Sequence, residues 1–402
     1  MQEQLISVED YFEKLGIRKY KNLLQFWSAI DAEYGLTRAR ELESVYKRLE
    51  AGDEESFYAK IFQSLELSIA FTSLRQDLYR NYLAWLDSFI TSEPRLIVDI
   101  GCGNGVLSCY LASRYPGAQI IGLDISSEAV SCSIKLAEKL GIENARFLES
   151  SAEETAGSLA GEKADLIMSV AVLGPEPASA DPEEIPLKSL FEKRSKDSGS
   201  RTIAGLSELL ADGGNLVSFD KVKDPRAQLN WIMDIVNTGL EVDFGSCAWL
   251  TYEDIEAESI TLPVLVARKR NGEGEDNQPD FDEILSFLLA RDGSDTLLHL
   301  EGEQGLLAET LFRLAGPRSF VTGGRADYPD GGGTYWYEIW QTGPFLISFE
   351  HTNHGYRALR CSSLLEKTAC LEAFHRWVEE SRGYSTVSLL EGPDIDFQSE
   401  SK

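Results

Sequence analysis

Hydrophobic residues follow two different periodicities along the chain. Before residue 94 they recur at helical spacing, as Val8, Tyr11 and Leu15 show. From Leu96 onward, short continuous apolar runs alternate with stretches of helical spacing. Such runs are typical of strands buried on both faces of a parallel sheet, and the stretches between them are typical of connecting helices. The pattern predicts an α/β fold, with a doubly wound, mostly parallel sheet after a helical N-terminal segment.

The predicted core consists of alternating strands and helices followed by a closing hairpin. The strands are expected at 96–100, 119–124, 145–148, 165–172 and 215–219, the helices at 105–114, 126–140, 202–211 and 227–236, and the hairpin at 246–252 and 260–268. Ser126 or Ser127 can cap the second helix, and Gly141 ends it. Residues 174–200 are rich in Pro, Ser and charge. A loop of this length at a sheet edge is either a mobile lid or plain disorder.

A second folded unit is expected after an acidic linker. Residues 271–283 contain Gly, Asn, Pro and six acids without a base, which is typical of a domain boundary. The elements predicted beyond it are helices at 281–290 and 363–380 and strands at 296–300, 335–340, 345–349 and 356–361, with a Gly-rich stretch at 323–333 and no predicted element after Gly383. The predicted segments are a helical N-terminal cap (1–93), the sheet core (94–270), the linker (271–283) and a C-terminal α+β domain (284–390).

Three alternating glycines follow the first strand, in a stretch that reads Leu-Ile-Val-Asp-Ile-Gly-Cys-Gly-Asn-Gly from Leu96 to Gly105. Glycine adopts positive φ easily and has no Cβ, so this turn can lie against a ligand. A dinucleotide-binding turn would have its third glycine where Val106 stands, and the Asp99 carboxylate would repel a pyrophosphate. The same carboxylate suits a ligand with an ammonium group. S-adenosylmethionine has such a group, a cationic sulfonium and no phosphate.

A second acid ends the next strand. Asp124 follows the apolar run Ile-Ile-Gly-Leu and precedes Ile125. An acid at this place can accept hydrogen bonds from both hydroxyls of a ribose, and an apolar neighbour can lie beside adenine. The two acids therefore indicate the two ends of one adenosyl ligand.

Together these motifs resemble the class I S-adenosylmethionine-dependent methyltransferases. The resemblance rests on Val98–Gly105, Ile121–Asp124 and Leu210–Val217 and extends over roughly residues 75–270. It implies a seven-stranded sheet that ends in an antiparallel hairpin, a helical cap on the substrate side of the cleft, and S-adenosylmethionine as cofactor. The cofactor-binding residues that it implies are Asp99, Gly101, Cys102, Gly103, Asn104, Gly105, Asp124, Ile125, Ser151, Ala152, Glu153 and Ser169. One alternative is a catalytically silent binding module that keeps this fold.

Ser151 stands where the family most often has an aspartate that contacts the adenine amino group, so the contact falls to the serine hydroxyl or to Glu153. Ser169 lies at the end of the fourth predicted strand, where ligands of α/β sheets bind, and is expected near the reacting methyl group.

The methyl acceptor is expected to be a small molecule. The formal net charge of −28 repels phosphate backbones, so nucleic acid is not expected as a partner. Methyltransferases that act on nucleobase amines usually have an Asn or Asp, then Pro-Pro and an aromatic residue, after the fourth strand. This chain has Leu-Gly-Pro-Glu-Pro at residues 173–177. An alternative acceptor is a protein or peptide that the C-terminal domain recognises.

The remaining reactive residues point to no further chemistry. Six scattered cysteines without a Cys-x-x-Cys pair indicate a reduced, cytoplasmic protein without a zinc site. No apolar run is long enough for a membrane span, so no membrane partner is expected. The histidines, His299, His351, His354 and His375, all fall in the C-terminal unit. His351 or His354 is a general base only if that unit covers the cleft, and the sequence otherwise assigns no catalytic residue.

Overall fold

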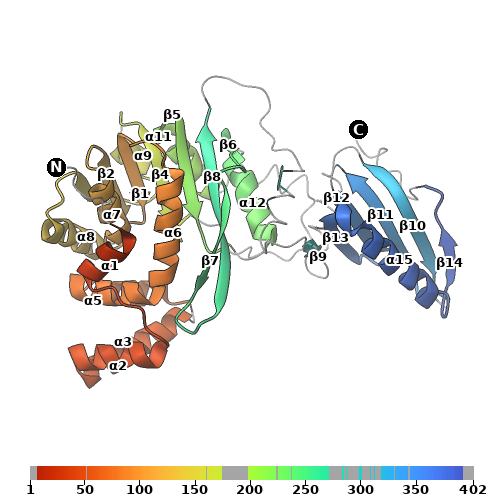
Figure 1. The fold of residues 1–402 in the computed structure, drawn as a ribbon, viewed down its shortest axis with the longest axis horizontal. Coiled ribbons are helices and arrows are strands. Elements are labelled where there is room, and N and C mark those ends of the chain that lie inside the picture. The colour runs from red at the N-terminus through yellow and green to blue at the C-terminus, as the bar shows by residue number, and fades with distance from the viewer. Residues whose placement is uncertain are drawn as a thin grey trace. The chain divides into compact units, whose positions relative to one another are not determined.

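The computed structural model describes two compact units (Figure 1). The described residues are 7–50, 52–159, 161–173, 198–222, 225–236, 238–270, 318–329, 331–342 and 345–392, with isolated positions between 283 and 312. One unit consists mainly of Met1–Pro175, Ser195–Lys223 and Trp231–Asn277, and the other is built around Gln278–Lys402. Most of the predicted lid, the predicted linker and the helix predicted at 281–290 lie outside the described residues. The four segment boundaries stay predictions.

The N-terminal part of the first unit is helical, as predicted. Its elements are α1 (Val8–Leu15), α2 (Leu23–Tyr34), α3 (Leu36–Glu50), α4 (Glu54–Ile61), α5 (Leu65–Thr72), the 3-10 helix η1 (Ser73–Arg75) and α6 (Gln76–Phe89). The side chains of Ser7, Asn22, Asp53 and Ser64 each accept a hydrogen bond from a backbone N–H in the first turn of the helix that follows. Helices α2 to α5 share a core around Phe26, Leu42, Phe57 and Phe71. Helices α1 and α6, together with Leu65 and Ile69 of α5, pack into the core of the sheet.

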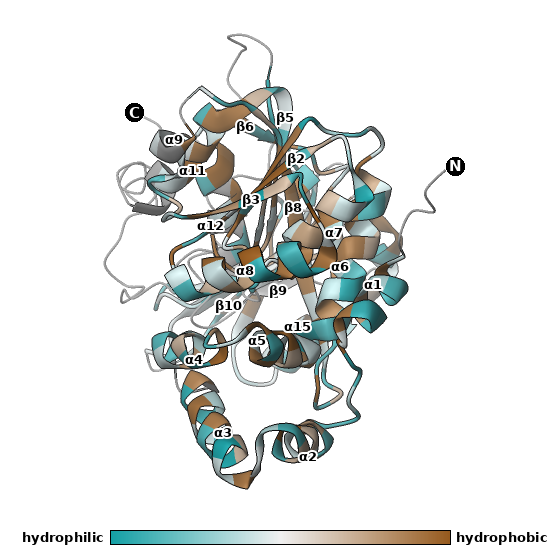
Figure 2. Cartoon of the chain, turned by 90° about the vertical axis from the view of Figure 1, so that its left-hand side faces the viewer, coloured by the Kyte–Doolittle hydropathy of each residue, from teal (hydrophilic) through white to brown (hydrophobic). Residues whose placement is uncertain are grey.

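The central sheet has the predicted mostly parallel form. Its strands are β1 (Leu96–Ile100), β2 (Gln119–Asp124), β3 (Ala145–Glu149), β4 (Ala164–Val170), β5 (Leu210–Phe219), β6 (Leu240–Val242), β7 (Ala248–Glu253) and β8 (Ser259–Lys269), in the order β3-β2-β1-β4-β5-β8-β6 with β7 also paired to β8. The connecting helices are α7 (Val106–Arg114), α8 (Ser127–Leu140), α9 (Thr155–Ser158), α11 (Ser198–Leu209) and α12 (Pro225–Val236). Figure 2 shows hydrophobic strands with α8 in front of them.

The first five strands run parallel, and this arrangement sets the place of the site. β1 pairs with β2 on one side and β4 on the other, and all five of its residues are buried. Because parallel strands end at a common edge, the turns after β1, β2, β4 and β5 lie along one side of the sheet. The glycine turn connects β1 to α7, between the ends of these strands.

The closing hairpin differs slightly from the prediction. β8 runs antiparallel to β5, and β6 and β7 pair with successive stretches of it: Val242 opposes Ala267, and Ala248 opposes Val264. The sheet therefore has eight strands where seven were expected. β5 also begins five residues before the predicted start, at Leu210.

The second unit is an antiparallel sheet with one long helix, which agrees with the predicted α+β class. Its elements are β9 (Leu298–Leu300), β10 (Ser319–Asp327), β11 (Thr334–Thr342), β12 (Phe345–Thr352), β13 (Arg357–Ser363), η5 (Leu364–Glu366), α15 (Lys367–Ser381) and β14 (Thr386–Leu389). The strand order is β14-β10-β11-β12-β13-β9. Phe374 and Val378 of α15 pack on Tyr337 and Leu346 of the sheet.

Two strands of this unit were not predicted. β10 contains Gly323 and Gly324 of the Gly-rich stretch, and β14 follows Gly383, where no element was expected. A Cβ on Gly324 would lie 2.7 Å from Cζ3 of Trp377 on α15. The glycine therefore makes room for the helix that covers the sheet, although it weakens the strand signal in the sequence.

No helix among the described residues is both long enough and apolar enough to cross a membrane.

Candidate functional site

The glycine turn after β1 uses positive φ at each of its glycines. Gly101, Gly103 and Gly105 have φ of 71°, 57° and 78°. The backbone nitrogens of Gly101 and Cys102 donate hydrogen bonds of 2.7 and 2.9 Å to the carbonyl oxygen of Leu123. The turn is therefore fixed to the end of β2.

The three glycines differ in what surrounds them. A Cβ on Gly101 would lie 2.2 Å from Cγ2 of Val172, and one on Gly105 would lie 2.9 Å from Cβ of Ser133. A Cβ on Gly103 would meet a single neighbouring atom, Cζ of Phe62 at 3.8 Å. Packing thus excludes side chains at the first and third glycines, whereas the middle glycine leaves room for a ligand to approach the backbone.

Asp124 is held at the end of β2 by two backbone groups. Its Oδ2 accepts a hydrogen bond of 2.9 Å from the Gly103 nitrogen, and its Oδ1 accepts one of 2.9 Å from the Ser126 nitrogen. The adjacent Ile125 is 76% exposed. Since each carboxylate oxygen has two lone pairs, this carboxylate is fixed in direction and can still accept further hydrogen bonds.

Asp99 lies deeper, near the end of β1. Its side chain is buried, and its Oδ2 accepts a hydrogen bond of 2.5 Å from the Ser108 hydroxyl of α7. Burial raises the pKa of Asp99 to about 7; the Ser108 hydrogen bond opposes this shift, and the Asp124 charge adds to it. The group can therefore take up or release a proton near neutral pH.

The side chains of Cys102 and Asn104 are buried and have structural roles in the glycine turn. Asn104 is buried, and its Nδ2 donates to the hydroxyls of Thr72 at 3.0 Å and Ser68 at 3.3 Å, both on α5. The Cys102 thiol is buried 3.9 Å from the Ser133 hydroxyl, and burial raises its pKa well above the usual value. Asn104 thus joins the turn to the helical cap, and Cys102 is an unreactive thiol.

The segment after β3 lies beside Asp124. The Ser150 nitrogen donates to the Asp124 carbonyl oxygen at 3.0 Å. The Ser151 hydroxyl accepts a hydrogen bond of 3.2 Å from the Glu154 nitrogen, and Glu153 accepts one of 3.1 Å from the Thr202 hydroxyl of α11. Ser151 and Ala152 are half-buried. Both side chains predicted to contact adenine thus also have roles in the local fold.

Ser169 lies in β4 between Ile100 of β1 and Ser218 of β5. Its side chain is fully buried, and its hydroxyl has no hydrogen-bond partner among the residues that the structure describes. Asp220, directly after β5, accepts hydrogen bonds from the backbone nitrogens of Val172 at 2.8 Å and Leu173 at 3.1 Å. Buried polar groups therefore gather at the ends of β4 and β5.

The sequence analysis missed Asp220 and a group of cap residues. Asp220 is 3% exposed and follows a strand as Asp124 does, which is a signal that could have identified it. From the cap, Tyr82 stacks on Phe219 with ring centroids 5.1 Å apart. Burial raises the pKa of Tyr82 well above its usual value, and the Asp99 and Asp220 carboxylates raise it further. Tyr82 thus lies within electrostatic range of both acids, and no local pattern in the sequence indicates this arrangement.

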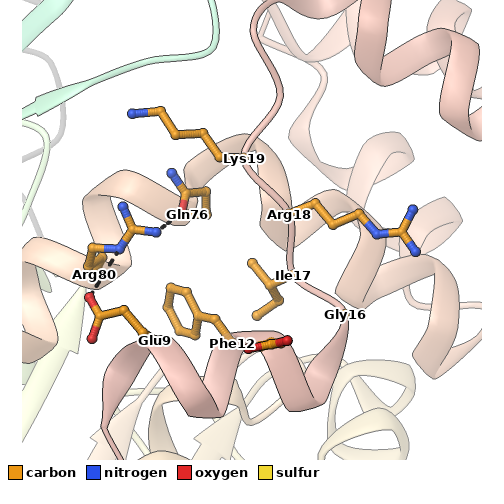
Figure 3. A pocket seen from close by; sticks show the side chains of 9 residues that line it. Glu9, Phe12, Gly16, Ile17, Arg18, Lys19, Gln76 and Arg80 are labelled. Carbon is orange, nitrogen blue, oxygen red and sulfur yellow. Dashed lines mark hydrogen bonds and ion pairs between the residues drawn. The ribbon is translucent and has the colours of Figure 1, made fainter.

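A separate cavity of about 300 Å³ lies within the N-terminal helices (Figure 3). It is lined by Glu9, Phe12, Glu13, Gly16, Ile17, Arg18, Lys19, Gln76 and Arg80. Phe12 and Ile17 form its apolar part, and Arg80 bonds to Gln76 and pairs with Glu9 across one side. None of the predicted cofactor residues lines this cavity.

His351 and His354 each interact with other residues of the second unit. His351 is 4% exposed and stacks on Trp336 with ring centroids 4.8 Å apart. His354 lies in the turn between β12 and β13, where its backbone nitrogen donates to the Thr352 hydroxyl at 3.3 Å. His351 is thus a core residue of its own sheet.

Comparison with known proteins identifies the domain. Residues 95–234 match the family model of a methyltransferase domain. A tRNA (guanine-N(7)-)-methyltransferase of Chloroherpeton thalassium is 39% identical over 62 residues, covering 15% of this chain and 27% of the relative. A release factor glutamine methyltransferase of Vibrio cholerae is 32% identical over 114 residues, covering 27% and 40%. The chain thus spans less than half the length of these curated relatives.

Among solved structures, magnesium protoporphyrin IX methyltransferase from Synechocystis PCC 6803 with bound SAM is 20% identical, with a TM-score of 0.35 over 52% of this chain and 84% of that chain. The assignment of the domain rests on the sequence match. Residues 95–234 form a methyltransferase domain. Because the relatives include a tRNA enzyme, the comparisons do not support the expectation that nucleic acid is excluded.

Proposed function

We propose that the methyltransferase domain at residues 95–234 binds S-adenosylmethionine along the glycine turn and transfers its methyl group to a small molecule. The observation that carries the proposal is the Asp124 carboxylate, which two backbone N–H groups hold at the end of β2, next to the open side of Gly103. A fixed acceptor beside a backbone without side chains suits a ribose with two adjacent hydroxyls.

The other predicted residues fit the two ends of the cofactor. The exposed Ile125 and the half-buried Ser151 and Ala152 lie beside Asp124, where the adenine would be bound. At the other end, Asp99 provides negative charge for an ammonium group. The buried hydroxyl of Ser169, which has no partner among the described residues, is available to a polar group of the ligand near the methyl.

The proposed methyl transfer requires few catalytic groups from the protein. The sulfonium of the cofactor supplies the activated methyl group. The residues of the chain hold the cofactor in one orientation and keep water away from the reacting atoms, which is where most of the rate enhancement of such a displacement arises. We assign no general base, because an amine or thiolate acceptor can react without one.

A small-molecule acceptor is favoured by charge. The net charge of −28 repels the phosphates of nucleic acid. The described cap helices lie close to the glycine turn, as the bonds from Asn104 to α5 show. A polypeptide acceptor is the second candidate, because the second unit is a separate sheet that is not needed to complete the methyltransferase sheet.

Two measurements test this function. Calorimetry with S-adenosylhomocysteine should show saturable binding at one site, and absence of binding by the folded protein would overturn the cofactor assignment. Incubation with S-adenosylmethionine labelled in its methyl group, together with separate fractions of small metabolites, RNA and protein, should transfer label to a small metabolite. Label that accumulates in RNA or protein instead would refute the acceptor class while leaving the cofactor assignment intact.

A further inference from the structure

The cavity within the N-terminal helices lies between α1 and the start of α6 (Figure 3). Phe12 of α1 and Ile17, just after that helix, are 3% and 7% exposed and form its apolar part. Gln76 and Arg80 line it from α6. The volume of about 300 Å³ is at the lower end of the range for small-molecule sites, so a ligand here has the size of a small metabolite.

The polar groups of α6 at this cavity include N–H donors without an acceptor. The Nε atom of Arg80 is buried and has no hydrogen-bond partner in the described part of the chain, since Glu9 Oε1 lies 3.6 Å away. Gln76 is 5% exposed; its Oε1 accepts from Arg80 Nη2 at 2.7 Å, and its Nε2 makes no hydrogen bond to any described residue. A buried donor without an acceptor is costly, and a carboxylate in the cavity would satisfy donors of both side chains.

Negative charge also lines the cavity. The Glu13 carboxylate of α1 makes no ion pair or hydrogen bond with the described residues, and Glu9 is exposed beside Arg80. Arg18 and Lys19 add two further cations to the lining. Because both signs of charge are present, a ligand with one kind of charge would lie near a group of like charge. A zwitterion can place each of its charges near an opposite one.

These features match the parts of an α-amino acid with an apolar side chain. Its carboxylate would accept hydrogen bonds from Gln76 and Arg80. Its ammonium group would lie near Glu13, and its side chain would pack on Phe12 and Ile17. A fatty acid and a phosphate ester lack the ammonium group, and a simple amine lacks the carboxylate.

A hydrogen bond connects the α1 wall of the cavity to the glycine turn. Tyr11, which precedes Phe12 on α1, donates from its buried hydroxyl to the Val106 carbonyl oxygen at 2.8 Å. Val106 directly follows Gly105 and is the first residue of α7. A ligand that contacts both α1 and α6 would therefore stabilise the arrangement of the cap around the turn.

We propose that this cavity binds an α-amino acid with an apolar side chain, and that its occupancy raises the affinity of the protein for the cofactor. The amino-acid site is separate from the proposed cofactor site, since the two share none of their residues. Only the effect on affinity rests on the proposed function, because it assumes that the cofactor binds along the glycine turn. By linkage, the cofactor raises the affinity for the amino acid by the same factor.

Binding is tested by calorimetry with L-phenylalanine and two analogues: 3-phenylpropionate, which lacks the ammonium group, and 2-phenylethylamine, which lacks the carboxylate. The wild type should bind phenylalanine saturably with a Kd below about 1 mM, and each analogue should bind about 10-fold more weakly or worse. Absence of saturable binding of phenylalanine, or equal affinity for all three compounds, would overturn the site.

Three variants locate the charges of the ligand. Glu13→Gln should lose the preference for phenylalanine over 3-phenylpropionate, and because Glu13 is exposed, this variant should fold normally. Arg80→Met should lose the preference over 2-phenylethylamine. Arg38→Met is the matched control and should keep both preferences: Arg38 also bonds a glutamine and an acid three positions away, and its side chain is 31% exposed against 32% for Arg80, but it does not line the cavity. Preferences that survive in Glu13→Gln and Arg80→Met would place phenylalanine elsewhere and refute the site.

The effect on the cofactor is tested by calorimetry with S-adenosylhomocysteine in the absence and presence of saturating phenylalanine. Phenylalanine should raise this affinity about 5-fold or more. Tyr11→Phe lacks the hydroxyl that bonds Val106, so it should bind phenylalanine with a much smaller effect on S-adenosylhomocysteine. Unchanged affinity for S-adenosylhomocysteine in the wild type would overturn the coupling. A wild type that binds phenylalanine but not S-adenosylhomocysteine would instead refute the proposed function and support the amino-acid site.

Discussion

The side-chain amide of Asn104 donates a hydrogen bond of 3.0 Å to the hydroxyl of Thr72, which joins the glycine turn to the last residue of α5. The same amide also reaches the Ser68 hydroxyl at 3.3 Å. The donor and both acceptors are buried. The cap is therefore hydrogen-bonded to the glycine turn beside the proposed cofactor site. A substitution in the cap should therefore affect the turn, and a substitution in the turn should affect the cap.

Asn104→Ala should weaken both the fold and the binding of cofactor. The change leaves two buried hydroxyls on α5 without this donor, and we expect a loss of about 1–3 kcal/mol in the free energy of unfolding. The affinity for S-adenosylhomocysteine should fall as well, because the cap is no longer fixed to the turn. Urea unfolding and calorimetry measure the two effects.

Asn144→Ala provides the control for this prediction. The Asn144 amide donates to the carbonyl oxygens of Ala112, Tyr115 and Ala118 and has no bond to the cap. It should lower stability by a similar amount and leave the affinity of the folded protein unchanged. If both variants lose affinity equally, the bond between Asn104 and the cap has no special role in binding.

The glycines of the turn should respond differently to substitution by alanine. Both Gly101→Ala and Gly103→Ala place a side chain at positive φ, which costs about 1–2 kcal/mol. Gly101→Ala adds a clash with Val172 and should fail to fold stably. Gly103→Ala should fold, since its Cβ has space, but should lose cofactor binding because the methyl group occupies the ligand side of the turn. Thermal unfolding and calorimetry on both variants decide this; a Gly103→Ala protein that binds normally would place the ligand elsewhere.

Asp124→Asn should weaken binding of the cofactor, because Asp124 is the proposed acceptor of the hydrogen bonds from the ribose hydroxyls. Asparagine keeps one acceptor oxygen for the backbone but loses the charge and the second acceptor, so the affinity for S-adenosylhomocysteine should fall by about 1.5–3 kcal/mol. An analogue that lacks a ribose hydroxyl should bind the wild type more weakly and should show a smaller further loss in the variant. Independent, additive losses from the two changes would argue against a direct contact between Asp124 and the ribose.

Asp99 should make stability depend on pH. Because burial raises its pKa in the folded protein to about 7, the folded state keeps a proton that the unfolded chain loses near the ordinary value of 3.8. The contribution of Asp99 to stability is then fully present below about pH 4 and is lost as the pH rises through 7. Relative to Asp99→Asn, the wild type should lose roughly 3 kcal/mol of unfolding free energy between pH 5 and pH 8. A constant difference between the two proteins across this range would show that Asp99 does not titrate there.

The sequence was sufficient to predict the strands that build the site. β1, β2 and β4 are continuous apolar runs, and the glycines and acids that follow them are local signals, so the turn and Asp124 were predicted without any knowledge of the packing. β6 was missed because Leu240–Val242 is too short to show a periodicity. β10 was missed because the glycines that make room for Trp377 resemble those of a loop.

The cap residues of the site could not be predicted in this way. Tyr79 and Tyr82 lie in α6, which has no local sign of a ligand, and they come within electrostatic range of Asp99 only because α6 packs beside the sheet. The sequence also does not show that the Asp99 carboxylate is buried against Ser108. Contacts of this kind depend on tertiary packing, which periodicity and motifs do not encode.

The first unit should fold and bind the cofactor without the second unit. β8 ends at Lys269, whose ammonium group donates to the carbonyl oxygens of Ser207 and Leu210, so the final strand of the methyltransferase sheet is anchored at its end by groups of the first unit. The residues of the proposed cofactor site also all precede this point. A chain that ends at Gly272 should therefore fold and bind S-adenosylhomocysteine with native affinity, while transfer to the true acceptor should be lost if the second unit shapes acceptor specificity. Circular dichroism, calorimetry and the methyl-transfer assay measure these three properties. An insoluble product, or one without cofactor affinity, would contradict the division at this point. A full rate of transfer would show that the second unit serves another purpose, such as association of two copies of the chain.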